Sequence, residues 1–319
     1  NDFAITTGTV TAPSGTLNVN GNWTNSGTFT HNSGTVDFGA TSTGKTINPV
    51  ASSFGNVIFD GVGGGWSPLT NTFTATGNLT MTAGIFDNSN GSANVVVNGD
   101  VQGTAGIINM TANTFTQRIA SGKNFGTTSG ATNWTFNNLT FSNSNGGATP
   151  VTVTTNTDTG TVTVGGVMRI GNSGDASGAT TTLDAGVLRV WNLTGTSGNP
   201  FQILASPAAV LTANTAAFFY LGDNPSGNTT VTAATYYKLV IQNSAETFVP
   251  SGSLVANHRV NVNSGTFDLG GNNITIGSAG VTNSGFLNVL AAGTYTQSSP
   301  GTTTILSSSA ATGVQVGGA

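Results

Sequence analysis

Apolar and polar residues alternate one by one in short stretches along most of this 319-residue chain. The apolar members of these stretches are Leu17 and Val19, Val36 and Phe38, Val162 and Val164, Val260 and Val262, Phe267 and Leu269, and Ile274 and Ile276. A single Asn, Asp or Thr separates the two members of each pair. Because successive side chains of a β-strand point to opposite faces, the pattern predicts strands with one buried face and one solvated face.

An aromatic pattern marks a strand start at three places. In residues 54–59, 136–141 and 236–241, an aromatic residue is followed three positions later by an aliphatic one, and another apolar residue comes two positions after that. A glycine beside apolar residues lies 26 or 27 positions beyond each of these aliphatic residues. Three agreements of this kind indicate an internal repeat.

The glycine segments themselves recur at a shorter, regular spacing. Residues 82–85 return as 104–107, residues 166–170 as 186–190, and residues 263–267 as 283–287. A period of this length, with short strands and Gly or Asn turns, is typical of one coil of a β-solenoid, whose open edge only the next coil can pair. The predicted fold is therefore all-β, a parallel β-solenoid with coils of about 20–22 residues, and 319/21 gives about 15 coils.

The polar positions of the repeat are filled mostly by Thr, Ser and Asn. Thr is β-branched and suits a strand, whereas Asn tolerates the left-handed backbone of a tight turn and can form a ladder with its copy in the next coil. The 46 glycines can supply further turn positions with positive φ. The chain has no Cys, so the stability of the solenoid must come from stacking.

We interpret residues 1–319 as one continuous repeat body. Its predicted parts are a partial repeat at 1–53 and repeats at 54–135, 136–235 and 236–319. The second repeat is longer, because the step from Leu139 to Leu239 exceeds the step from Val57 to Leu139. The extra residues are expected as a lateral insertion near 199–225, where three prolines and an alanine-rich run favour a loop or one short helix.

Charged residues make up only 6% of the chain, with 7 Lys and Arg against 11 Asp and Glu. The net charge of −4 offers no basic field, so we expect no nucleic-acid partner. Hydrophobic residues reach 36% and are periodic, which indicates an ordered chain. No long apolar run predicts a membrane span, and the start at Asn1 without a signal-like segment is what we expect of a mature, soluble protein or of a fragment.

The acidic residues are spread along the sequence, which argues against a catalytic site. An enzyme that cleaves acidic polysaccharides needs clustered carboxylates, or paired cations, over a groove. Stacking could bring Asp87, Asp184 and Asp268 to similar positions, since each lies near a glycine segment. Solvated carboxylates at turns are the simpler interpretation, so we assign no catalytic, cofactor-binding or metal-binding residue and expect no enzyme activity.

Two pairs of basic residues are candidates for shared sites. Arg169 and Arg189 stand at equivalent places in successive glycine segments and would be neighbours about 4.8 Å apart in adjacent coils. Their repulsion would be offset by Asp184, by a partner chain or by water, and an exposed, hydrated pair is the favoured interpretation. His31 and His258 are far apart in sequence, which leaves no material for an imidazole metal site or a Ser-His-Asp relay.

Two further residue types could bind ligands. The oxygen-rich turns at 87–91 and 223–227 could hold a structural calcium ion, although neither supplies the second carboxylate of a tight site. Trp23 and Trp134 follow strand alternation and are expected in the packing. Trp66 stands in a run of glycines and is the tryptophan that we expect to be exposed.

A resemblance rests on the segments 34–38, 45–47, 54–59, 77–81 and 84–86. Their low-charge pattern, rich in Gly, Thr and Asn, resembles the repeats of large secreted bacterial surface proteins of the adhesin and filamentous-haemagglutinin-like kind. The pattern covers nearly the whole chain. The resemblance implies a fibrous, non-catalytic protein located outside the cell or on its surface.

The leading functional hypothesis is a structural subunit of an extracellular filament or surface layer, in which copies of the chain pair end to end through open solenoid edges. No charged residue lies between Asp2 and Asp37 or after Asp268, so the ends lack charged caps. The expected docking segments are 3–19 and 304–316. The alternative is an adhesin stalk that binds a surface glycan or a protein through the loop at 199–225, and a polysaccharide-active β-helix enzyme is the third hypothesis.

Overall fold

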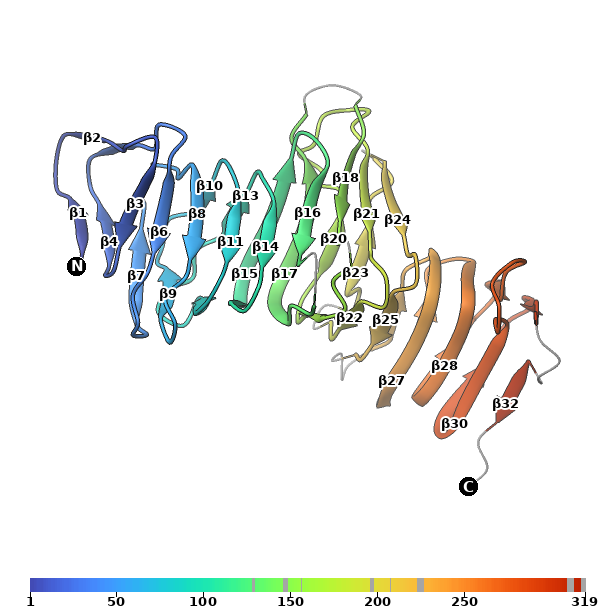
Figure 1. The fold of residues 1–319 in the computed structure, drawn as a ribbon. Helices are drawn as coiled ribbons and strands as arrows, with labels where there is room; N and C mark the ends of the chain where they lie inside the picture. The colour runs from blue at the N-terminus through green and yellow to red at the C-terminus, as the bar shows by residue number, and fades with distance from the viewer. Residues whose placement is uncertain are drawn as a thin grey trace.

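The chain folds into stacked coils of parallel β-strands, as predicted. The computed structural model describes residues 1–127, 130–145, 149–155, 157–195, 198–206, 208–222, 227–308 and 313–316. Figure 1 shows an elongated body with the N-terminus at one end and the C-terminus at the other. Every strand pairing among these residues is parallel, and none of them forms a helix that could span a membrane.

One side of the body is a sheet of nine strands. In chain order they are β3 (Thr16–Val19), β6 (Thr35–Phe38), β8 (Asn56–Phe59), β11 (Leu79–Met81), β14 (Val101–Gly103), β16 (Lys123–Gly126), β18 (Val151–Thr154), β21 (Thr181–Asp184) and β24 (Ala209–Thr212). Two short strands, β2 (Thr9–Thr11) and β5 (Thr28–Thr30), pair beside its first coils.

The remaining strands form one sheet of 21 that continues around the corners of the body. A first row contains β1 (Phe3–Ile5), β4 (Trp23–Asn25), β7 (Lys45–Asn48), β9 (Gly65–Pro68), β12 (Ile85–Asp87), β19 (Thr161–Val164), β22 (Val190–Leu193), β25 (Ala217–Tyr220) and β32 (Val314–Val316). The others are β10 (Phe73–Ala75), β13 (Val95–Val97), β20 (Met168–Ile170), β23 (Phe201–Ile203), β26 (Thr229–Val231), β29 (Ile274–Ile276) and β31 (Thr303–Ile305). The long strands β15 (Ile107–Ile119), β17 (Trp134–Asn143), β27 (Thr235–Pro250), β28 (Leu254–Asp268) and β30 (Phe286–Thr296) belong to more than one row.

The described residues make about 13 turns rather than the 15 expected. The predicted coil length is confirmed near the N-terminus, where Asn56 forms a hydrogen bond with Asn78 of the next coil, 22 residues later. The middle coils are longer, because Asn138 forms its equivalent bond with Val167, 29 residues later. The predicted mean coil length was therefore too short for the middle of the chain.

The alternation along the strands is confirmed by burial, and one core cluster extends from Ile5 to Val289. Trp23 and Trp134 lie in this core as expected. The prediction that Trp66 is exposed is wrong, since its side chain is fully buried. Glycines make this possible, because a Cβ at Gly64 would lie only 2.7 Å from the Trp66 ring.

Only one of the three glycine recurrences matches the coil register. Ile85 pairs with Ile107, so the recurrence of 82–85 at 104–107 is confirmed. The predicted pairing of 263–267 with 283–287 in the next coil is wrong, because Gly265 pairs with Gly293. The predicted pairing of 166–170 with 186–190 is also wrong, because Met168 pairs with Phe201. The shared Gly-apolar pattern reflects a common turn chemistry that occurs at more than one corner of the coil.

Residues 199–225 do not contain the short helix considered for them, as far as they are described. They supply β23, β24 and β25, which pair in register with β20, β21 and β22 of the preceding coil. The described part of this segment is therefore an ordinary coil. Its alanine-rich run forms strands because Phe218 and Tyr220 alternate into the core.

Asparagine side chains continue the hydrogen bonding between coils at one corner, which confirms the predicted ladder. The Oδ1 of Asn56 accepts the backbone N–H of Asn78 at 3.0 Å, and the Oδ1 of Asn78 accepts that of Asp100 at 2.8 Å. The Oδ1 of Asp100 in turn accepts the N–H of Asn124 at 2.7 Å. Each step joins one coil to the next, so these side chains extend the sheet around the corner.

Candidate functional site

Asp87, Asp184 and Asp268 are not brought together by stacking. Asp87 ends β12 in the first row, Asp184 ends β21 in the nine-stranded sheet, and Asp268 ends β28 several coils later. Each carboxylate accepts the N–H of the residue two positions on, at 3.1 Å, 3.0 Å and 2.9 Å respectively. The interpretation as turn carboxylates is therefore confirmed.

The turns considered for calcium are used differently or lie outside the described residues. The Asp87 carboxylate accepts hydrogen bonds from Ser67 Oγ at 2.5 Å and Ser89 Oγ at 3.0 Å. Residues 223–226 of the second turn are not described. No group of three or more His, Cys, Asp and Glu side chains that could hold a metal occurs within the described ranges.

Sequence reasoning missed one carboxylate pair, formed by Asp37 and Asp60. Asp37 lies on β6 and Asp60 directly follows β8 in the next coil, and together with Asn18 and Asn20 they line a shallow hollow of about 260 Å³. Burial and the neighbouring Asp60 carboxylate raise the pKa of Asp37 to about 6. Their separation in sequence is close to the coil period, which is the signal that could have found the pair.

Replacing Asp37 by Asn should make the protein more stable above pH 6 and change little near pH 4. A carboxyl whose pKa is raised on folding stabilises the folded state while it is protonated, and this contribution is lost as pH rises from about 3.8 to about 6. We expect the free energy of unfolding to rise by about 1 kcal/mol at pH 7, a value that already allows for solvent screening. Urea unfolding at pH 4 and pH 7 measures it.

Asp60→Asn provides the matched comparison. It removes the charge repulsion but leaves the Asp37 carboxylate buried, so its gain at pH 7 should be smaller than that of Asp37→Asn. A gain that is equal at pH 4 and pH 7 for either variant would contradict the assignment.

The predicted Arg169–Arg189 neighbour pair is wrong. Arg169 lies on β20 and pairs with Gln202 of β23, whose Oε1 accepts its Nε–H at 3.0 Å. Arg189 directly precedes β22 in a different row, where it is fully buried rather than hydrated. The two arginines share a sequence pattern but stand at different corners of the coil.

Arg189 instead forms a buried ion pair with Asp158, and both side chains are completely inaccessible to solvent. The Asp158 carboxylate also accepts the backbone N–H groups of Thr127, Thr132 and Gly160, at 2.9, 3.0 and 2.7 Å. Burial alone raises the pKa of Asp158, but the Arg189 charge and the hydrogen bonds from Thr132 and Thr127 outweigh burial and lower it. The pair lies in the interior of the middle coils, and its carboxylate is held by both the Arg189 charge and backbone N–H groups.

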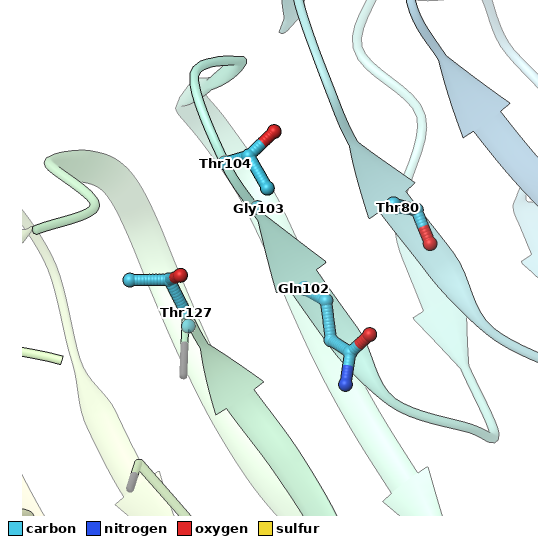
Figure 2. Close-up of a pocket in the computed structure, with 6 residues that line it drawn as sticks. Thr80, Gln102, Gly103, Thr104 and Thr127 are labelled. Atoms are coloured by element: carbon cyan, nitrogen blue, oxygen red, sulfur yellow. The ribbon is translucent and has the colours of Figure 1, made fainter. Parts of the chain in front are cut away.

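A small hollow of about 100 Å³ lies on the nine-stranded side, and no charged group is among the described residues that line it (Figure 2). Thr80, Gln102, Thr104 and Thr127 line it from successive coils, together with Gly103. A Cβ at Gly103 would lie 2.7 Å from Trp134, so glycine is needed for packing there. The hollow is smaller than most small-molecule sites, which measure about 300–1,000 Å³.

A larger groove of about 390 Å³ crosses the outer side of β22, β25, β27 and β28. Val190, Ala217, Lys238 and Arg259 follow one another in register along it, one from each coil. Phe219, on the same outer face of β25, adds an aromatic ring. Residues 215–219 of the groove belong to the segment that was expected to be a binding loop.

Two cations stand opposite each other in this groove. Lys238 pairs directly with Arg259 on the next strand, and the chain provides only 7 Lys and Arg in all. Burial and the Arg259 charge lower the pKa of Lys238, and burial followed by Arg259 and Lys238 lowers that of His258. His258 stacks on Tyr237 with ring centroids 4.8 Å apart. No carboxylate is among the residues described as lining the groove.

No family model, curated protein or solved structure matches this chain. The resemblance to bacterial surface repeats thus rests on the sequence pattern. The fold itself rests on the strand register described above.

The two ends of the body present strands that are paired on one side only, within the described residues. At the N-terminal end, β1, β2 and β3 pair only with β4, β5 and β6. At the other end, β31 and β32 pair only with β29 and β30. None of these five edge strands contains a charged residue or a proline.

Apolar side chains accompany these open strands. Phe3 on β1 stacks on Trp23 with ring centroids 4.3 Å apart and is itself only partly buried. At the opposite end, Leu306 is 47% exposed and Val314 is 49% exposed. Each end therefore combines strands that pair on one side only, within the described residues, with apolar surface.

Proposed function

We propose that this chain is a structural subunit of an extracellular filament or surface layer, in which the last coil of one copy stacks on the first coil of the next. The supporting observation is the pair of open edges at β1–β3 and β31–β32, whose strands contain no charged residue. Edge strands are templates for further pairing, and soluble proteins usually protect them with charges, prolines or bulges. The edge strands here have no such charge or proline.

The edge at β1–β3 and the edge at β31–β32 are different surfaces, so the proposed contact joins two unlike edges. Joining the C-terminal edge of one copy to the N-terminal edge of another keeps all strands parallel and continues the coil. Such a heterologous contact leaves one free edge at each end of the product, so it repeats without closing. A filament is the expected product, and a symmetric dimer is not.

Single charges placed at either edge should block assembly. We expect Phe3→Glu and Leu306→Glu each to remain single rods at concentrations where the unaltered chain forms fibres, because burying an unpaired charge in the contact is costly. Negative-stain images and sedimentation velocity measure the outcome. The control is Val62→Glu, which adds the same charge at a 77% exposed side chain between the ends and should leave the fibres unchanged.

Mixing the two blocked variants gives the sharper test. Phe3→Glu keeps a working C-terminal edge and Leu306→Glu keeps a working N-terminal edge, so the mixture should form dimers of defined size and nothing longer. Dispersed rods of the unaltered chain at high concentration would count against the proposal, as would blocking by Val62→Glu.

The second candidate function, a rod that binds a ligand on its side, is favoured by the groove across β22, β25, β27 and β28. A polysaccharide-cleaving enzyme remains the third hypothesis. The separate locations of Asp87, Asp184 and Asp268 give it little support, and the proposed function is non-catalytic.

A further inference from the structure

We propose that the groove across β22, β25, β27 and β28 binds an acidic saccharide, with Lys238 and Arg259 holding its carboxylate groups. The site is on the side of the body, away from the edges proposed to join copies, so it does not depend on filament formation. It also goes beyond a structural role, because it gives the rod a specific ligand.

The charges of the groove call for an anion. Like charges directly opposite each other on neighbouring strands destabilise a sheet. Lys238 and Arg259 stand in this arrangement, and neither forms an ion pair with a carboxylate of the described residues. A carboxylate between them would remove the repulsion, and the planar guanidinium can bind a carboxylate with two parallel hydrogen bonds.

Aromatic rings hold the two cations in position. The Nζ of Lys238 lies 5.6 Å from the centre of the Phe219 ring, and the guanidinium of Arg259 lies 5.8 Å from that of Phe286. The Nε–H of Arg259 donates to His258 Nδ1 at 2.9 Å. Side chains that are already ordered lose less entropy when a ligand binds, so the groove is prepared for its ligand.

A rigid, ring-shaped ligand fits this surface better than an extended peptide does. Peptides that bind β-sheets usually add a strand to an open edge. The strands under the groove, β22, β25, β27 and β28, each pair with a neighbour on both sides, so no backbone edge is free there. A ligand must therefore be recognised by side chains. The groove offers two cations beside apolar and aromatic side chains, and one of these, Leu188, is 66% exposed. An acidic sugar presents both a carboxylate and an apolar ring face.

Titration with trigalacturonate, measured by calorimetry at low ionic strength, tests the proposal. We expect saturable binding that weakens with added salt, because exposed charges are screened. Maltotriose, which is neutral, should bind at least about tenfold more weakly, because it offers no charged acceptor to Lys238 and Arg259. Equal binding of both trisaccharides would overturn the role of the cations.

The double variant Lys238→Gln with Arg259→Gln should lose at least about tenfold in affinity for trigalacturonate. Its unfolding midpoint in urea should be unchanged or higher, because the like-charge contact is gone, and this result separates a binding role from a folding role. The matched control, Arg118→Gln with Lys123→Gln, removes the same charge elsewhere and should keep the affinity. The proposal is overturned if the control loses as much affinity, or if triglutamate binds more tightly than trigalacturonate.

Discussion

Replacing Asp158 by Ala should lower the free energy of unfolding by about 3–5 kcal/mol, the expected cost of breaking a buried ion pair by removing one partner. The substitution leaves the Arg189 charge buried without a counter-ion. It also removes the acceptor of the backbone N–H groups of Thr127, Thr132 and Gly160. Urea unfolding followed by tryptophan fluorescence measures the loss.

Arg189→Met should cost less than Asp158→Ala, because the Asp158 carboxylate keeps its hydrogen bonds from Thr127, Thr132 and Gly160. The buried Nε–H of Arg189 has no hydrogen-bond partner among the described residues. The guanidinium is therefore incompletely hydrogen-bonded in the folded protein. The substitution removes the cost of burying the guanidinium, but it leaves the Asp158 carboxylate buried without a counter-ion, so it should still destabilise the protein. If Arg189→Met were the more damaging of the two, the account of the pair given above would be wrong.

The second large effect is expected at Phe54, where Phe54→Ala should cost about 3–5 kcal/mol. The Phe54 ring is 1% exposed and lies among aromatic rings of adjacent coils. Its ring centre is 5.0 Å from those of Trp23 and Phe73, and 5.9 Å from that of Phe38. Removing it opens a cavity that these rings cannot fill without moving.

The loss at Phe54 should be local. In a solenoid each coil contacts only its neighbours, so stability is close to a sum over coils. Hydrogen exchange should accelerate in the strands from β1 to β13 and stay unchanged from β19 onward. Phe54→Leu should cost clearly less, and Val62→Ala, at a 77% exposed side chain, should stay within about 0.5 kcal/mol. Uniform acceleration along the whole chain would show that the coils unfold together instead.

The fold class could be predicted from the sequence because it follows from local features, the alternation within strands and the repeat period. Alternation in pairs such as Val162 and Val164 indicates which side chains enter the core, and a short period shows that strands must stack. The register could not be predicted where turns vary in length. The coil that leads from Val162 to its partner Trp191 is longer than the coils near the N-terminus, so the shorter period paired Arg189 with the wrong neighbour.

The sites were harder to predict because they depend on register. Asp37 and Asp60 meet only because β6 and β8 are adjacent, and Lys238 meets Arg259 because their coil keeps the shorter period. The same spacing argument that failed for the arginines would have identified Lys238 and Arg259. Trp66 was misjudged for a different reason, since glycines around it permit close packing rather than exposure.

The corner ladder has a consequence for the ageing of the molecule. Its rungs require only an oxygen that accepts an N–H, and Asp100 already serves in one rung between Asn78 and Asn124. Slow hydrolysis of the Asn56 or Asn78 side-chain amide, which consumes water and releases ammonia, would leave a carboxylate that keeps an accepting oxygen. Deamidation of these asparagines would thus keep an acceptor for each hydrogen bond that joins one coil to the next at this corner.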